Sequence, residues 1–167
     1  MQAVWGSERE PELNAYLSQW ASMKLFGHNR GFGPCVTLGV LNGSNLVGVA
    51  VLHDHNPDAG LLEMSGASDS KLWLTRPVLW ALFSYSFIQI GCQMVVMRVS
   101  ERNQQWNGRG LPRFLKAYGF TAQRIPRLYG RHEDGVLYCL TDDAWRANGF
   151  HSKPRKFSQP PVDTVAA

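Results

Sequence analysis

The spacing of apolar residues changes several times along the chain, and each spacing predicts an element. Leu13, Leu17 and Trp20 recur at helical intervals after Pro11, so an amphipathic helix is expected over residues 11–25. Two apolar, β-branched runs at 35–41 and 46–54 flank a turn centred on Asn and Gly, which predicts a hairpin. A third strand is expected at 60–67. These three strands should form an antiparallel meander.

The second half of the chain continues with buried elements. An uncharged run at 77–97 is interrupted by polar residues such as Gln89, so it fits a membrane span poorly. We expect instead a buried helix over 78–91 that begins after Pro77 and ends at Gly91. A short buried strand (94–100), a polar loop (103–110) and a short helix (111–118) follow. Two more strands are expected, one from Gly119 and one at 135–140, and then a closing helical turn.

This order of elements predicts an α/β (α+β) fold with a mixed, mostly antiparallel central sheet and helices on both faces. The chain has 167 residues, which is enough for one domain, assigned here to residues 1–150. Residues 151–167 are polar and contain proline, and we expect them to be a flexible C-terminal tail.

Composition and charge narrow the class of protein. Apolar types make up 44% of the chain and charged types 18%, which excludes a disordered protein or a coiled coil. Three cysteines without C-x-x-C spacing indicate reduced core residues and a cytoplasmic location. The net charge of +4 is unevenly distributed, because residues 98–131 carry eight Lys or Arg against Glu101 alone. This basic block should face a polyanion, either a nucleic acid or the phosphates of a cofactor.

Four short stretches, in this order, resemble the GNAT N-acetyltransferase superfamily, and within it the branch that acetylates the N-termini of ribosomal proteins. They are YSFIQIGCQMVVMRV (85–99), ERN (101–103), FLKAYGF (114–120) and YCLTDDAW (138–145). The resemblance covers about residues 35–147. It implies an enzyme that transfers an acyl group, most simply acetyl, from acetyl-CoA to an amine by direct attack.

The resemblance also implies where acetyl-CoA would bind. In the family it enters a gap between the fourth and fifth strands, and its pyrophosphate meets the start of the following helix, where backbone N–H groups bind anions. The glycine-rich loop of the family is absent here, and Thr75 and Arg76 would have to replace its donors. The implied cofactor-binding residues are Met64, Ser65, Gly66, Leu74, Thr75, Arg76, Asn103 and Arg109.

Three residues are candidates for the chemistry. Glu63 lies inside an apolar strand at the place of the family's catalytic glutamate, and it is either the general base or a solvent-facing residue. Asn103 follows the next strand, where it would contact cofactor, order a water molecule or simply cap a loop. Leu115 replaces the family's acid tyrosine, so Ser100 or water would protonate the thiolate.

Two other features of the chain permit different functions. His53 and His55, with Asp54 and Asp58, have a spacing compatible with a metal, but we expect a surface pair near a turn and no metal site. The basic block would instead serve a nucleic-acid-binding or nucleic-acid-modifying protein, with Trp106 stacking on a base. The residues of that alternative are Arg102, Trp106, Arg109 and Arg113. A non-catalytic GNAT-like binding module is a further alternative.

The acceptor is a protein, a small molecule or a nucleic acid, and no membrane partner is expected. Two loops should recognise it, residues 26–34 and residues 124–134, and neither has a readable specificity pattern. The oligomeric state is not encoded in any visible motif.

Overall fold

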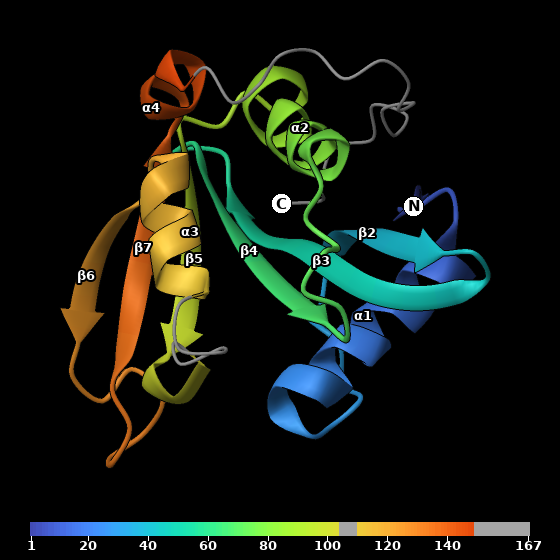
Figure 1. The fold of residues 1–167 in the computed structure, drawn as a ribbon, viewed down its shortest axis with the longest axis horizontal. Helices are drawn as coiled ribbons and strands as arrows, with labels where there is room; N and C mark the ends of the chain where they lie inside the picture. The colour runs from blue at the N-terminus through green and yellow to red at the C-terminus, as the bar shows by residue number, and fades with distance from the viewer. Residues whose placement is uncertain (104–109, 149–167) are drawn as a thin grey trace.

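The computed structural model describes residues 1–103 and 110–148, and these residues form one seven-stranded sheet with helices on both faces (Figure 1). The spatial order of the strands is β1-β2-β3-β4-β5-β7-β6. The strands are β1 (Gln2–Gly6), β2 (Cys35–Asn42), β3 (Asn45–Asn56), β4 (Leu61–Ser68), β5 (Met94–Ser100), β6 (Thr121–Ile125) and β7 (Gly135–Thr141). The helices are α1 (Pro11–Phe26), α2 (Arg76–Ser84), the π-helix η1 (Tyr85–Gln89), α3 (Leu111–Tyr118) and α4 (Asp142–Ala147).

All neighbouring strands are antiparallel except β4 and β5, which are parallel and joined by the crossover through α2. The alternation of side chains along the strands gives the sheet two buried faces. On one, α1 packs through Leu17 and Ala21 against Val49 and Val51 of β3, and we call this the α1 face. On the other, the α2 face, lies a larger core that includes residues of α2, η1, α3 and α4.

The expected fold class is confirmed, with three local differences. The strand β1 was missed, because five residues are too short for a clear alternating pattern, and it pairs with β2 at the sheet edge. The helix expected over 78–91 changes at Tyr85 from α-helix to π-helix, where the Ile90 N–H donates to the Tyr85 carbonyl. The strand expected from Gly119 begins at Thr121, because Gly119 is the left-handed cap of α3.

Residues 104–109 and 149–167 lie outside the described residues, and so do the expectations that fall on them: the tail at 151–167, Trp106 and Arg109. The assignment of residues 1–150 to a single domain stays a prediction. Within the described ranges, no helix combines the length and apolar character that a bilayer crossing requires.

The cysteines are free thiols, as expected, and Cys92 is buried whereas Cys35 and Cys139 are half-buried. Burial raises the pKa of Cys92 to about 11, because the thiolate loses its hydration there. At pH 8 only about one Cys92 in a thousand would be the reactive thiolate. We expect iodoacetamide to label Cys92 in the native protein at least tenfold more slowly than after unfolding in guanidinium. Equal rates, measured by peptide mass spectrometry, would contradict the burial of this thiol.

Candidate active site

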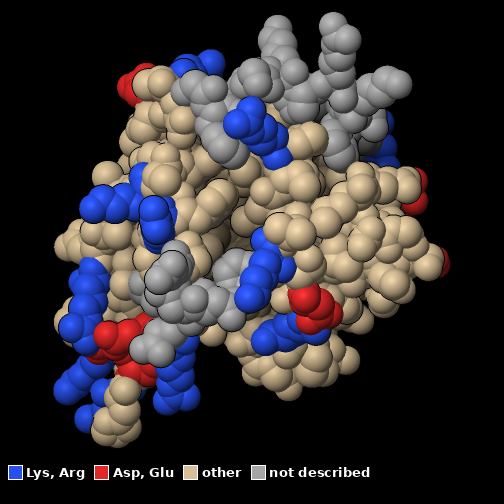
Figure 2. Space-filling model, viewed as in Figure 1, with Lys and Arg blue, Asp and Glu red and all other residues tan. Residues whose placement is uncertain are grey.

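The sheet opens where β4 and β5 separate, and we call this place the fork. Their parallel pairing covers only Leu61–Glu63 with Met94–Val96, and the last pair is Glu63 with Val96. Beyond it β4 continues to Ser68 and β5 to Ser100, and the two strands diverge (Figure 1). The space-filling view shows the surface hollowed between the half of the molecule that carries α3 and the half that carries β4 (Figure 2). The β4 residues expected to bind the cofactor, 64–66, lie directly beyond the fork.

Glu63 is held at the fork by an ion pair. Its side chain is only 13% exposed, and the Arg98 Nε donates to Glu63 Oε1 at 2.6 Å. Arg98 comes from β5, two residues beyond the last β4–β5 pair, so both side chains lie on the α1 face. The hydrogen bond to Glu63 raises the pKa of Arg98, although burial opposes this. Glu63, the predicted general base, thus lies at the fork, and its carboxylate is paired with the Arg98 guanidinium.

His53 lies beside Glu63, and the expectation of a surface histidine pair is wrong for it. His53 pairs with Glu63 across β3 and β4 and is 3% exposed. Its Nε2 is 2.9 Å from the Ser65 hydroxyl, and its Nδ1 is 2.8 Å from Asp54 Oδ2. Side chains of successive strand residues normally point to opposite faces. Here Asp54 has a φ of 49° at a register shift in β3, and this irregularity brings its carboxylate to the neighbouring ring.

His53, Asp54 and Glu63 have one potential metal-ligand atom each within 4.8 Å of the others. Both nitrogens of His53 are engaged, one by Asp54 and the other by Ser65. The Arg98 guanidinium already supplies a positive charge at Glu63. A metal ion would therefore have to displace existing partners, and the geometry favours a hydrogen-bonded cluster.

Both loops expected to recognise the acceptor reach this cluster. Phe32, from the loop after α1, lies with its ring centroid 4.8 Å from that of His53. Tyr129, from the loop between β6 and β7, is close enough for the charges of Arg98 and Glu63 to act on its phenol. Burial raises the pKa of Tyr129, with Arg98 opposing and Glu63 reinforcing the change. The ring of Phe32 thus lies against His53 on the α1 face, and Tyr129 lies within electrostatic range of Arg98 and Glu63.

The expected phosphate site at the start of α2 is built differently from a glycine-rich loop. Thr75 is the N-cap, and its Oγ1 accepts the Val78 N–H at 3.5 Å. Pro77 in the first turn has no N–H to offer. Fewer backbone donors therefore remain for an anion than a glycine loop would provide. The Thr75 hydroxyl proton and the exposed Arg76 side chain are the groups that the first turn presents.

Trp73 fixes the loop that leads into α2. It is 7% exposed and lies on the α2 face over two glycines, Gly48 of β3 and Gly66 of β4. A Cβ at Gly48 would be only 2.6 Å from the Trp73 ring, so glycine is required there by close approach. The indole thus attaches residues 69–75 to the strand that borders the fork.

The other candidate residues lie near the end of β5. Ser100 is 7% exposed, its hydroxyl donates to a Glu133 carboxylate oxygen, and it accepts the Arg102 N–H at 3.1 Å. The bond to Glu133 joins β5 to the β6–β7 loop. Asn103 is exposed in the turn that follows β5, and Leu74 is half-buried beside Thr75. The catalytic and binding roles of these residues stay predictions.

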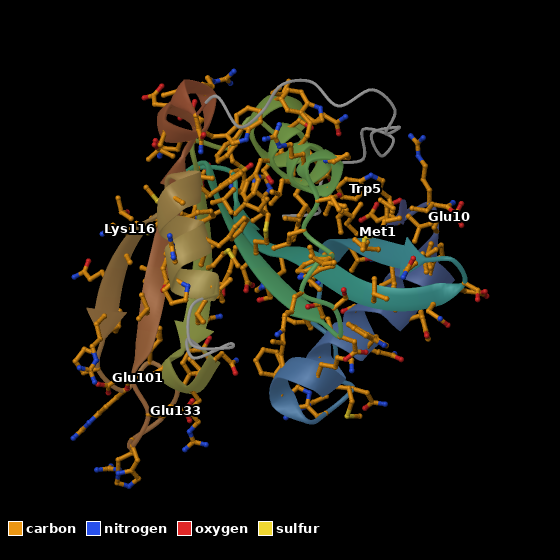
Figure 3. The ribbon with its side chains drawn as sticks, viewed as in Figure 1. Met1, Trp5, Glu10, Glu101, Lys116 and Glu133 are labelled. Atoms are coloured by element: carbon orange, nitrogen blue, oxygen red, sulfur yellow. The ribbon has the colours of Figure 1, made fainter. Side chains whose placement is uncertain are left out.

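The basic block is partly neutralised by Glu101, which lies within it, and by two acids that follow it in sequence. Arg102 pairs with Glu133, and Arg124 pairs with both Glu101 and Asp134. Glu101 and Glu133 lie near one another at the same end of the molecule (Figure 3), and the space-filling view shows red side chains among the blue ones there (Figure 2). Arg113 is exposed on α3. The mixed charge makes this end less suited to a phosphate backbone than the sequence suggested.

Sequence reasoning missed three members of the fork. Arg98 was counted in the basic block and not as a partner of Glu63, and Ser65 was considered only for its place on the cofactor strand. The contact of His53 with Asp54 depends on the irregular backbone at Asp54, which no local sequence pattern predicts. The nearest signal was the polar run His53-Asp54-His55 at the end of an apolar strand.

Comparison with known proteins gives matches at the level of structure alone. No family profile matches the sequence, and no curated protein matches it. Similar solved structures include an acetyltransferase-like protein from T. thermophilus, with TM-score 0.58, 18% identity and coverage of 71% of this chain and 64% of that one. A variant of spermidine N-acetyltransferase from Vibrio cholerae has TM-score 0.61 and 11% identity, with 87% and 97% covered. A protein assigned to the GNAT family from Desulfovibrio desulfuricans has TM-score 0.58 and 14% identity, with 84% and 99% covered.

These matches show likeness of fold, with TM-scores of 0.58–0.61 at 11–18% identity. The ribosomal-protein branch has no support from them, since none of the matched structures quoted above carries such a name. The chain has the fold of the GNAT acetyltransferases.

Proposed function

We propose that this protein is an N-acyltransferase that transfers an acyl group, most simply acetyl, from acyl-CoA to an amine. The observation that carries the proposal is the fork, where β4 separates from β5 beside a cluster of polar side chains. The matched acetyltransferase structures support the same activity.

The residues beyond the fork fit acetyl-CoA. Strand β4 pairs with β3 along one edge, and within the described ranges its residues 64–68 have no ladder partner on the edge facing β5. Exposed N–H and C=O groups of a strand edge match the two amides of a pantetheine arm. We assign this arm to Met64, Ser65 and Gly66. The phosphates are assigned to Thr75 and Arg76, whose hydroxyl and guanidinium replace the absent glycine-loop donors.

When bound, acetyl-CoA supplies the thioester carbon that the acceptor amine attacks. The acceptor approaches between Phe32 and Tyr129, the aromatic side chains of the two loops on the α1 face. Glu63, whose side chain is 13% exposed, is the carboxylate that meets the ammonium form of the acceptor. Its role as a general base stays a prediction.

Isothermal titration with acetyl-CoA tests the proposal. We expect one saturable site per chain. The variant Arg76→Ala should raise the Kd at least about fivefold, because it removes a charge-assisted contact to phosphate. Lys71→Ala, which removes a cation from an exposed position of the same loop, is the matched control and should change the Kd less than twofold. Absence of binding at millimolar acetyl-CoA would refute the proposed function.

A further inference from the structure

Three side chains form a continuous hydrogen-bonded chain from the fork to the protein surface. Ser65 lies on β4, two residues beyond the last residue paired with β5, and is half-buried. It bonds to His53 Nε2 at 2.9 Å, and His53 Nδ1 lies 2.8 Å from Asp54. The side chain of His53 is 4% exposed, whereas that of Asp54 is 67% exposed. A buried imidazole therefore connects a hydroxyl at the gap with a carboxylate in solvent.

The partners fix the direction of these hydrogen bonds. A carboxylate only accepts, so the bond to Asp54 places a proton on His53 Nδ1. In the neutral imidazole the other nitrogen, Nε2, is then unprotonated and accepts the Ser65 O–H. The Ser65 hydroxyl thus donates its proton to a base, the unprotonated His53 Nε2. Glu63, by contrast, accepts a hydrogen bond from Arg98 through its Oε1 at 2.6 Å.

We propose that Ser65, His53 and Asp54 form the proton relay of the acyl transfer, with Ser65 as the group that touches the reacting amine. This inference rests on the proposed function. Ser65 is the catalytic residue of the relay, whereas His53 and Asp54 are positioning residues that act through Ser65.

The relay accounts for the proton that must move from the amine nitrogen to the thiolate sulfur. The bound ammonium group first loses one proton to solvent, and the neutral amine nitrogen then forms a bond to the acyl carbon while the bond from that carbon to sulfur breaks. The amine N–H proton passes to Ser65 Oγ while the Ser65 hydroxyl proton passes to His53 Nε2, giving an imidazolium stabilised by Asp54. The same path in reverse delivers that proton to the departing thiolate. The products are an amide and a neutral thiol, and the relay returns to its starting state.

This path protonates the departing thiolate, which is the role of the family's acid tyrosine. The position of that tyrosine is held here by Leu115, a buried core residue. It also gives a function to the unusual backbone at Asp54. A non-glycine residue in the left-handed region is uncommon, and here it is the conformation that brings the carboxylate to the imidazole.

Kinetics with substituted proteins provide the first test. Thiol release from acetyl-CoA is measured with spermidine, lysine methyl ester and an alanine-initiated peptide as amines, and acetyl-CoA binding is measured by titration. Ser65→Ala and His53→Gln should lower kcat about 100-fold or more, and Asp54→Asn at least tenfold. All three should keep the acetyl-CoA Kd within twofold. The nearby substitutions Asp58→Asn and His55→Gln are matched controls and should keep wild-type rates.

The pH profile separates a relay from a structural role. The groups that face His53 are Asp54 on its own strand, Cys35 on β2 and Glu63 on β4, with Arg98 of β5 beside Glu63. The pH profile of kcat should differ in shape between the wild-type protein and His53→Gln, because the variant lacks the imidazole through which the relay acts. A Ser65→Ala protein with more than half of the wild-type kcat would overturn the relay.

Nitrogen NMR of histidine-labelled protein tests the relay without any acceptor. At neutral pH we expect His53 to be protonated at Nδ1 and unprotonated at Nε2. Asp54→Asn, whose amide can donate to Nδ1, should reverse the tautomer, whereas Asp58→Asn should not. A proton on Nε2 of the wild-type protein would overturn the proposal. If acetyl-CoA fails to bind, the proposed function is refuted, and the tautomer still decides whether Ser65 faces a base.

Discussion

Trp73→Ala should lower the free energy of unfolding by about 3–5 kcal/mol, the range typical of a buried Trp replaced by Ala. The ring is 7% exposed and fills the space above Gly48 and Gly66. Its removal leaves a cavity over these two glycines, because they have no side chains that could fill it. In a chain of this length the Tm should fall by roughly 6–20 °C. Denaturant unfolding and calorimetry measure both quantities.

The same substitution should weaken acetyl-CoA binding. Trp73 attaches residues 69–75 to β4, and this segment places Thr75 and Arg76 at the start of α2. Leu72→Ala is the matched control, because Leu72 is adjacent and 74% exposed, and it should change stability by less than about 0.5 kcal/mol. A Trp73→Ala protein with wild-type stability would contradict the packing of the indole on the sheet.

Glu63→Gln should raise the KM for the amine at least about tenfold while the acetyl-CoA Kd and kcat change less than threefold. The carboxylate is 13% exposed, and opposite charges interact strongly in such a partly desolvated site. Glutamine keeps the size of the side chain and removes the charge that meets the ammonium group. Steady-state kinetics with the fastest amine separate the two constants.

This result would distinguish Glu63 from the relay, because the relay variants lower kcat instead. Glu101→Gln is the matched control, since Glu101 is 54% exposed and pairs with Arg124 away from the fork. If Glu63→Gln lowers kcat 100-fold with an unchanged KM, Glu63 is the general base, as the family resemblance implies, and the binding role assigned to it is wrong.

Local patterns predicted most of the fold because they are read over a few residues. The turn between β2 and β3 has Gly43 at a φ of 62°, and α1 begins at Pro11, ends at Phe26 and is capped by the left-handed Gly27. The strand β1 has too few residues to show a period, and its place depends on pairing with β2. The π-helical turn at Tyr85 likewise has no pattern that separates it from the preceding helix.

The candidate site was predicted unevenly for the same reason. Glu63 stood out because a single acid in an apolar strand is a local signal. Its partner Arg98 lies 35 residues away, and Ser65 lies 12 residues from His53, so these contacts exist only once β3, β4 and β5 are side by side. The positive charge of residues 98–131 was misleading in isolation, because Glu133 and Asp134 fold back onto it.

Local sequence was enough to specify the order of the elements after β1, the strand that carries Glu63 and the loops that border the fork, since hydrophobic period, glycine turns and capping residues act over short distances. Three features exist only in the assembled sheet. They are the separation of β4 from β5 after Glu63, the contact of Arg98 with the Glu63 carboxylate, and the burial of His53 between Asp54 and Ser65. Register and side-chain direction across strands are set by packing over the whole sheet, and a change of one residue in register would turn each of these groups to the opposite face.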